Sequence, residues 1–195
     1  MFKYITHFVP FHSESSKVMC MDKVFVHMID TYYATGKATW LKKEQLKKVM
    51  DRADELRDSQ CGNRIPNIIL PGLDQNEWVS LYDVKSKYTA VIIWESTCGH
   101  CKKELPKYRD IYADWKDKGL EIFAIGNDFD PAPWIDYVNE KGYNDWINVS
   151  DNPLVNAQDS ASVLIYNGTT TLKSLNFRTT FDVFATPKVF LLDED

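Results

Sequence analysis

The stretch VIIWESTCGHCKKELPKY, from Val91 to Tyr108, decides how this chain is interpreted. It begins as a run of apolar, β-branched residues, which is typical of a buried central strand. Cys98 and Cys101 follow, with two residues between them, and apolar residues then recur at helical spacing as far as Lys116. The pattern predicts that the cysteine pair lies where a buried strand gives way to a helix.

This position has chemical consequences for the two thiols. A sulfur at the start of a helix lies near the free backbone N–H groups of the first turn, and the helix dipole favours its thiolate. We therefore predict that Cys98 is an attacking thiol of low pKa and that Cys101, one turn on, is a shielded resolving thiol. Exchange would proceed through a mixed disulfide on Cys98.

The residues between the cysteines are expected to tune the pair. Gly99 and His100 fill these positions, and a protonated imidazole beside a thiolate stabilises the reduced form. The expected reduction potential is about −180 to −230 mV, between those of thioredoxin and protein disulfide isomerase.

Other interpretations of a Cys-x-x-Cys pair rank below the redox one. A zinc site needs two more ligands at usable spacing, and Cys20, Cys61 and the other histidines form no second paired motif. Two inert buried thiols are the bland alternative. A peroxidase would need only one low-pKa cysteine in a different local setting, and nothing in the sequence supports it.

The composition suits a globular protein. The 195 residues are 44% hydrophobic and 26% charged, enough for one good-sized domain or a small domain with an appendage. A net charge of −5 without a long basic block argues against a nucleic-acid or anionic-membrane partner. No apolar run reaches about 18 residues, the length of a membrane span. The first residues do not make a convincing signal peptide, because Lys3, His7 and Pro10 interrupt them.

The chain divides into two parts near Gly62. Residues 1–61 are predicted to form a small helical extension, with helices over 17–33 and 42–58, that packs or dimerises. Residues 62–195 alternate strands with helices, which indicates an α/β domain with parallel strand pairs. The expected strands are 67–70 and 78–81 as a hairpin, then 89–94, 121–126, 146–150 and 188–194, with helices over 98–116 and 134–141. Residues 151–175 are predicted to be an insertion with a hairpin turn at Asn167-Gly168.

Several positions together resemble the thioredoxin superfamily, specifically its TlpA/ResA-like branch of bacterial envelope thiol-disulfide oxidoreductases. Trp94 stands four residues before the first cysteine, Pro106 stands five after the second, and CKKELP (101–106) continues the motif. Residues 63–85 resemble the lead-in hairpin of that branch, and residues 176–195 resemble its cis-proline segment. The resemblance covers about 62–195 and implies a thioredoxin-like fold, a central mixed β-sheet flanked by helices. The helical segment resembles the extension found on such proteins in Bacteroides-type bacteria.

The resemblance also implies site residues. Thr186-Pro187 would lie opposite the cysteines with the bond in the cis form, where the Thr186 backbone could pair with a substrate strand. Trp94, Thr186 and Pro187 are then expected to bind substrate, and Glu104 to tune thiol protonation. The plain alternatives are a trans proline that starts an edge strand and a solvated glutamate on a helix.

The same resemblance implies partners and a compartment. Substrates would be protein disulfides or dithiols, with an upstream thiol that donates or accepts electrons. The redox-active disulfide Cys98–Cys101 would serve without any further cofactor, metal or nucleic acid. The expected location is the bacterial periplasm or cell envelope, reached through a signal or anchor that this sequence does not contain.

The sequence departs from the family pattern in several places. Ile92 replaces the buried acid that usually accepts the proton of the resolving thiol, so water or Glu104 would have to serve, and Thr97 replaces a common tryptophan. The final strand and helix are missing after Asp195, which leaves a truncated domain as the expectation. We also expect Cys20 and Cys61 to be buried thiols, with a disulfide between them as the alternative. A binding module on a thioredoxin-like scaffold, with incidental redox chemistry, remains the second hypothesis for function.

Overall fold

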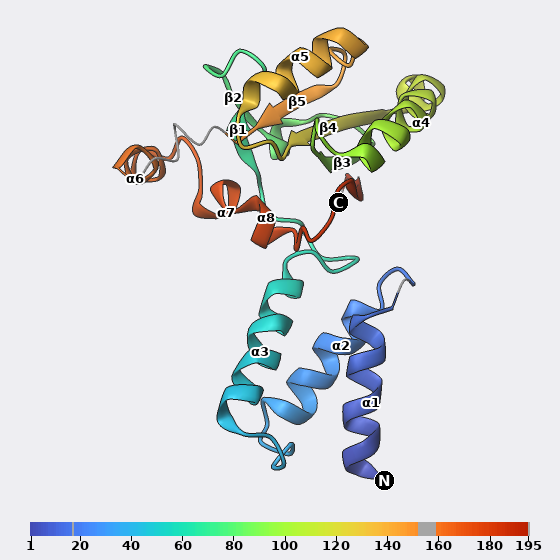
Figure 1. Cartoon of the computed structure of the whole chain (residues 1–195), viewed down its shortest axis with the longest axis vertical. Coiled ribbons are helices and arrows are strands. Elements are labelled where there is room, and N and C mark those ends of the chain that lie inside the picture. Colours follow the sequence, from blue (N-terminus) through green and yellow to red (C-terminus); the bar gives the residue numbers. More distant parts are fainter. Residues whose placement is uncertain (17, 152–158, 195) are drawn as a thin grey trace. The chain divides into compact units, whose positions relative to one another are not determined.

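A computed structural model describes residues 1–16, 18–151 and 159–194 of the chain. These residues form two compact units, shown in Figure 1. The helical unit comprises Met1–Pro66 together with Arg178–Asp182. The sheet unit comprises Asn67–Phe177 and Val183–Asp195, and it contains the Cys-x-x-Cys motif.

The Met1–Pro66 part of the helical unit contains three α-helices and one π-helical turn among its described residues. Their bounds are α1 (Phe2–Glu14), α2 (Asp22–Met28), η1 (Ile29–Tyr33) and α3 (Lys43–Arg57). Apolar side chains from these elements and the loop before α3 make a small core: Phe25, Val26, Ile29, Tyr33, Ala38, Ala53 and Leu56. The two helices predicted over 17–33 and 42–58 are confirmed, although the first begins only at Asp22.

Helix α1 is absent from the predicted elements, and it carries Pro10 in its interior. A proline there cannot donate the backbone hydrogen bond that the carbonyl of Thr6 would otherwise accept. The Tyr33 hydroxyl donates to that carbonyl instead, at 2.7 Å. A tertiary contact therefore satisfies the carbonyl that the proline leaves open.

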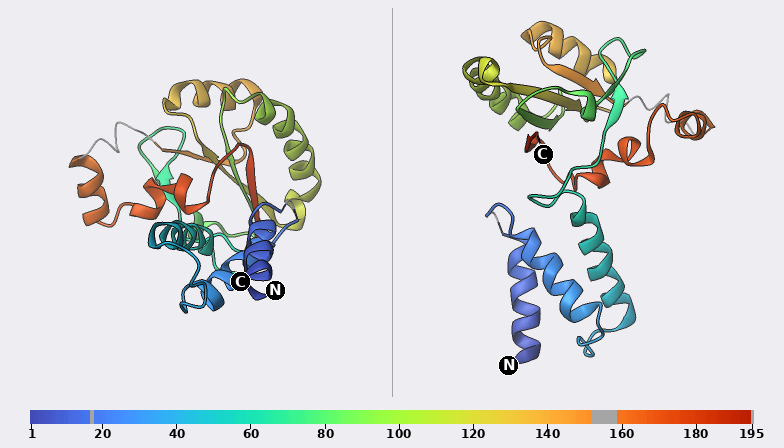
Figure 2. Two further views of the ribbon diagram at one scale, coloured as in Figure 1. Left: turned by 60° about the horizontal axis from the view of Figure 1, so that its bottom comes forward. Right: turned by 180° about the vertical axis from the view of Figure 1, so that it is seen from behind.

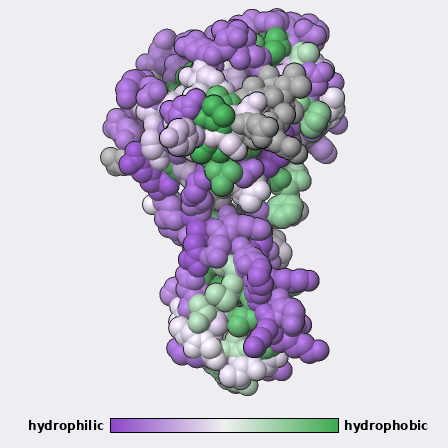
Figure 3. Space-filling view, turned by 90° about the vertical axis from the view of Figure 1, so that its left-hand side faces the viewer, coloured by the Kyte–Doolittle hydropathy of each residue, from purple (hydrophilic) through white to green (hydrophobic). Residues whose placement is uncertain are grey.

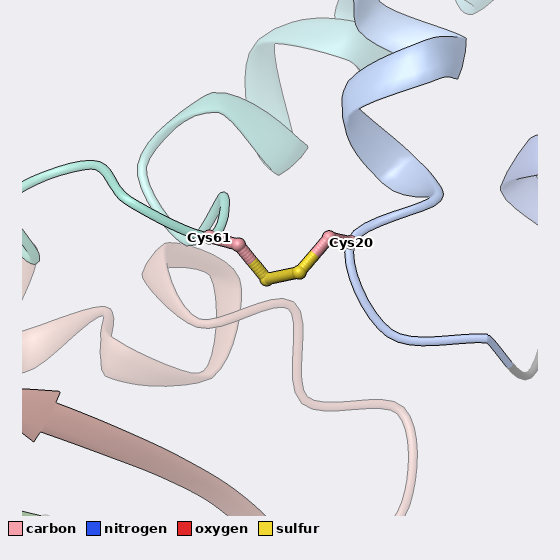
Figure 4. The surroundings of a disulfide bond; sticks show 2 residues. All are labelled: Cys20 and Cys61. Carbon is pink, nitrogen blue, oxygen red and sulfur yellow. A yellow bond between two sulfur atoms is a disulfide. The ribbon is translucent and has the colours of Figure 1, made fainter.

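A disulfide joins Cys20 to Cys61, so the expectation of two free buried thiols was wrong. Their Cα atoms are 5.5 Å apart and 41 residues separate them in sequence. Figure 4 shows the bond between the segment that precedes α2 and the segment that follows α3. The approach depends on how the helices pack, which no local pattern in the sequence reports.

The sheet unit has a four-stranded mixed sheet in the order β5-β4-β3-β6. The strands are β3 (Tyr88–Trp94), β4 (Leu120–Gly126), β5 (Ile147–Ser150) and β6 (Lys188–Asp193). β3, β4 and β5 run parallel, and β6 pairs antiparallel with β3. A separate antiparallel hairpin, β1 (Ile69–Pro71) and β2 (Trp78–Ser80), precedes them. The predicted hairpin and strands are confirmed with small shifts at their ends.

Two helices, α4 (Gly99–Trp115) and α5 (Pro131–Lys141), cover one face of this sheet, as Figures 1 and 2 show. Their buried side chains pack with alternate residues of β3 and β4 in one core: Ile92, Trp94, Cys101, Leu105, Tyr112, Ile122, Ala124, Trp134 and Val138 are its central members. Short 3₁₀ turns lie at η2 (Leu81–Asp83) and η3 (Lys116–Lys118). Strand β3 is thus the buried central strand that its apolar run predicted.

The hairpin predicted within 151–175 was wrong. The described part of this segment holds helices α6 (Asp159–Tyr166) and α7 (Leu172–Leu175), with α8 (Phe177–Thr180) after it, and residues 152–158 lie outside the described residues. Gly168 has a φ of 76° and donates its N–H to Ile165 O at 3.1 Å. The Asn-Gly pair therefore ends a helix, a place where a left-handed glycine is as common as in a turn.

The surface is mostly hydrophilic on the face shown in Figure 3, where apolar residues form small separate patches. Among the helices of residues 1–16, 18–151 and 159–194, none is long and apolar enough to cross a membrane.

Candidate active site

The two cysteines of the motif lie between the end of β3 and the first turn of α4. Cys98 is the N-cap of α4, and its sulfur accepts a hydrogen bond from the backbone N–H of Cys101 at 3.4 Å. Both are free thiols. The Cys98 side chain is partly exposed, whereas Cys101 has an exposed fraction of 0%. One sulfur is therefore open to a reagent and the other is shielded.

A cis peptide bond joins Thr186 to Pro187, which confirms the predicted isomer. Pro187 stands directly before β6, whose first residue, Lys188, pairs with Ile93 near the end of β3. This pairing brings Thr186 to the cysteines across 88 residues of sequence, and the Cys98 thiol donates to its carbonyl oxygen at 3.4 Å.

The surroundings move the two thiol pKa values in opposite directions. A hydrogen bond from the Thr186 side chain, followed by the backbone N–H of Cys101, lowers the pKa of Cys98, against a smaller effect of burial. The backbone N–H of His100 acts in the same direction. Burial dominates at the other thiol and raises the pKa of Cys101 to about 11. Both effects follow from how well each site solvates a thiolate.

The predicted tuning residues all lie on the first turns of α4. Gly99 and His100 are exposed, and a side chain at Gly99 would meet no atom within 4 Å. The Glu104 carboxylate accepts a hydrogen bond from Lys107 at 2.7 Å. It also helps to raise the pKa of Tyr108, after burial and ahead of a weaker effect of Cys101. In the described residues the Glu104 carboxylate bonds Lys107, and the hydrogen bonds of the Cys98 sulfur go to Cys101 and Thr186 instead.

Trp94 does not lie where its predicted contact with substrate requires. Its side chain has an exposed fraction of 0% and packs against Trp134 and Tyr137, with ring centroids 6.4 and 5.5 Å away. A side chain buried on both sides cannot meet another protein. Trp94 instead belongs to the hydrophobic core that also contains Cys101, because helices cover the face of β3 on which the Trp94 side chain lies.

Two buried polar residues beside the motif were missed at the sequence level. Asp128 follows β4 and has an exposed fraction of 6%, and Ser96 lies two residues before Cys98 with 5% exposed. The Ser96 backbone N–H donates to both Asp128 carboxylate oxygens, at 2.9 and 3.2 Å, and its hydroxyl donates to Oδ1. The parallel strands β3 and β4 end at the same edge of the sheet, and this rule could have pointed to the pair.

The described residues offer no group of three or more His, Cys, Asp or Glu side chains placed to hold a metal ion. The zinc interpretation of Cys98 and Cys101 therefore gains no third ligand from this part of the chain.

Curated proteins resemble part of the chain. Thiol-disulfide oxidoreductase ResA of Bacillus thuringiensis (strain Al Hakam) is 31% identical over 83 residues, 43% of this chain and 47% of the relative. The protein of that name from Bacillus subtilis (strain 168) is 33% identical over 64 residues, 33% of this chain and 35% of the relative. The chain thus spans about half the length, or less, of these curated relatives.

Solved structures extend the likeness. A domain of a possible thiol-disulfide isomerase from Cytophaga hutchinsonii superposes with a TM-score of 0.54 at 29% identity, covering 68% of this chain and 77% of that one. A thioredoxin-like protein from Bacteroides caccae reaches a TM-score of 0.69 at 19% identity, covering 99% of this chain and 62% of that one, and shows the fold alone.

The family model of the AhpC/TSA family matches residues 61–195. This match takes in more than half of the chain, including the motif, the cis-proline and the whole mixed sheet. The fold is the thioredoxin-like one that the resemblance implied, and the protein belongs to the AhpC/TSA family.

Proposed function

We propose that the protein is a thiol-disulfide oxidoreductase that exchanges disulfides with protein substrates through Cys98 and Cys101. One observation carries the proposal: a partly exposed thiol at the N-cap of α4 lies one turn from a fully buried thiol, and these surroundings lower the pKa of the first and raise that of the second. This division suits an attacking and a resolving thiol. The names of the ResA relatives give the proposal independent support.

The proposed reaction begins with the Cys98 thiolate. It attacks one sulfur of a substrate disulfide, forms a mixed disulfide and releases the other substrate sulfur as a thiolate, which takes up a proton. Cys101 then loses its proton and attacks the Cys98 sulfur, which releases the second substrate thiol and forms the Cys98–Cys101 disulfide. Two electrons pass from the cysteine pair to the substrate, and an upstream dithiol would restore the pair. The reverse sequence oxidises a substrate dithiol.

Thr186 and Pro187 are proposed to receive the substrate. The Thr186 carbonyl accepts from the Cys98 thiol, so a polypeptide bound to the Cys98 sulfur must pass this backbone. Strand-like pairing with Thr186 would hold that polypeptide without a fixed sequence requirement. Gly99 and His100 border the same sulfur from the exposed first turn of α4, where His100 would tune the potential. Glu104, on the first turns of α4, would tune thiol protonation.

We propose the bacterial periplasm or cell envelope as the place of action. The Cys20–Cys61 disulfide supports this location, because disulfides between distant residues persist in oxidising compartments and are rare in reducing ones. The same environment supplies protein disulfides as substrates.

An insulin-reduction assay with dithiothreitol or glutathione as electron donor tests the proposal. We expect Cys98→Ser to reduce turnover to the rate of the buffer alone, because the attacking thiolate is lost. Cys101→Ser should accumulate mixed disulfides on Cys98, visible by mass spectrometry under non-reducing conditions. Unchanged activity in the Cys98 variant would end the proposal, and a wild-type protein without activity would favour a binding module on the same scaffold.

A further inference from the structure

The turn that leads into Cys98 is tied at two points to the segment after β4. The backbone N–H of Asn127 donates to the Trp94 carbonyl at 2.7 Å. One residue further on, the Asp128 carboxylate accepts three hydrogen bonds from Ser96. Within the turn itself, the N–H of Cys98 donates to the Glu95 carbonyl at 3.2 Å. The turn is thus fastened between the strand end and the helix start.

The Asp128 anchor is unusual in being a buried carboxylate without an ion-pair partner in the described residues. A carboxylate loses much of its hydration on burial, and hydrogen bonds to its charge must replace it. Ser96 donates hydrogen bonds to both of its oxygens. Bonds of this kind are strong, so they hold the Ser96 backbone and side chain in one orientation.

The Cys98 sulfur that follows this turn makes two hydrogen bonds. The distance from the Cys98 sulfur is 3.4 Å both to the Cys101 N–H nitrogen and to the Thr186 carbonyl oxygen. Because hydrogen bonds weaken as they lengthen and tilt, a displacement of the turn would weaken both contacts. The bond from the Cys101 N–H is the one of the two that stabilises the thiolate, since a thiolate cannot donate to the Thr186 carbonyl.

We propose that Asp128 is a positioning residue, which fixes the turn from Glu95 to Cys98 through Ser96 and so aims the Cys98 sulfur at the Cys101 N–H and Thr186. The inference rests on the proposed function of Cys98 as attacking thiol. Asp128 does not touch the reacting sulfur in this account. Its effect reaches the sulfur through the backbone of Ser96 and Thr97, and loss of the anchor weakens the hydrogen bond that the Cys101 N–H donates to the Cys98 thiolate.

The test is the pH dependence of Cys98 alkylation by iodoacetamide in the reduced full chain, followed by mass spectrometry. Asp128→Ala removes every bond to Ser96, whereas Ser96→Ala removes only the hydroxyl bond and keeps the negative charge. Ser96→Thr keeps both the hydroxyl and the N–H. We expect about threefold to tenfold less Cys98 thiolate at neutral pH in Asp128→Ala, a smaller loss in Ser96→Ala, and wild-type behaviour in Ser96→Thr.

A matched control separates positioning from general stability. Tyr112 lies in α4, the helix that follows the motif, but away from the cysteines. Tyr112→Phe removes the hydroxyl that bonds Glu121 at 3.0 Å and Asp145 O at 3.3 Å. It should lower the melting temperature and leave the alkylation midpoint unchanged. If Ser96→Ala behaves like Tyr112→Phe, with a lower melting temperature and an unmoved midpoint, the positioning role is wrong.

The alkylation midpoint is read without any substrate protein, so it is independent of turnover. A wild-type chain that fails to reduce insulin while Ser96→Ala still shifts the midpoint would remove the proposed function and keep the geometric role of Asp128. If the wild-type protein reduces insulin and the midpoint is unshifted in both Ser96→Ala and Asp128→Ala, the proposed function stands and the positioning role of Asp128 is wrong.

Discussion

Cys20 and Cys61 are 41 residues apart in sequence and are joined by a disulfide in the helical unit, whereas Cys98 and Cys101 are separated by two residues and are both free in the sheet unit. A bond between distant segments removes many conformations of the unfolded chain, and a bond between near neighbours removes few. The distant pair is therefore suited to stabilising a fold, and the near pair to changing its redox state.

The surroundings of the two pairs also suit one to a structural role and the other to a reactive role. Cys98 lies at a helix N-terminus with hydrogen-bond donors around its sulfur, which lower its pKa. Cys20 and Cys61 lie in the segments that flank α2 and α3, and each is half-buried. The four residues are all cysteines, so the difference in their chemistry comes from the backbone that surrounds each sulfur.

Removal of the Cys20–Cys61 disulfide is expected to have the largest effect on stability, and it tests whether this pair is the structural one. Replacing both Cys20 and Cys61 by Ser opens a loop of 41 residues, and the chain-entropy model gives a loss of about 4 kcal/mol in the unfolding free energy of the helical unit. Hydrogen exchange of peptides from α1, α2 and α3 measures the change. Turnover of insulin should persist.

The matched control replaces the near pair. Cys98→Ser with Cys101→Ser should leave exchange in α1 to α3 unchanged and abolish turnover. If the two double variants affect stability and turnover alike, the division between a structural and a reactive pair is wrong.

A second prediction sharpens the contrast within the reactive pair itself. Because its pKa is lowered, Cys98 is a thiolate at pH values where a free cysteine is still protonated. As the pH is lowered, Cys98 should therefore continue to be alkylated at pH values where free glutathione no longer reacts. Cys101 should resist alkylation until the pH approaches about 11. Peptide-level mass spectrometry of the reduced protein from pH 5 to 11 follows both sites, with free glutathione as the reference. Equal midpoints for the two cysteines would contradict the assignment of attacking and resolving thiols.

The smallest expected effect compares the disulfide with a single hydrogen bond in the same helical unit. Tyr33→Phe leaves the Thr6 carbonyl unpaired beside Pro10, which should cost about 1 kcal/mol of unfolding free energy. Tyr4→Phe is the control, because the Tyr4 side chain is 68% exposed. Urea unfolding monitored by exchange in α1 measures both, and a Tyr33 variant as stable as the Tyr4 variant would show that the contact contributes nothing.

The candidate site was predictable from the sequence where the signal is local. The strand before Cys98 and the helix after it leave patterns of spacing and composition, whereas the cis bond at Pro187 was expected only from the family resemblance. Helix α1, with Pro10 inside it, and the Cys20–Cys61 bond leave no such local pattern, because they depend on segments that meet only in the folded chain. The Asp128–Ser96 contact also joins distant segments, and only the rule that parallel strands end at one sheet edge points to it. For Trp94 the family resemblance implied contact with substrate, but the side chain is buried because it lies on the covered face of β3.

The reduction potential of the Cys98–Cys101 pair tests the central claim most directly. The protein would be equilibrated in glutathione and dithiothreitol buffers, and the redox state of each pair read from alkylated peptides, so that Cys20–Cys61 is followed separately. The account predicts a two-electron transition of Cys98–Cys101 at about −180 to −230 mV, while Cys20–Cys61 stays oxidised through that range. A near pair that never changes state, or a transition confined to Cys20–Cys61, would contradict it.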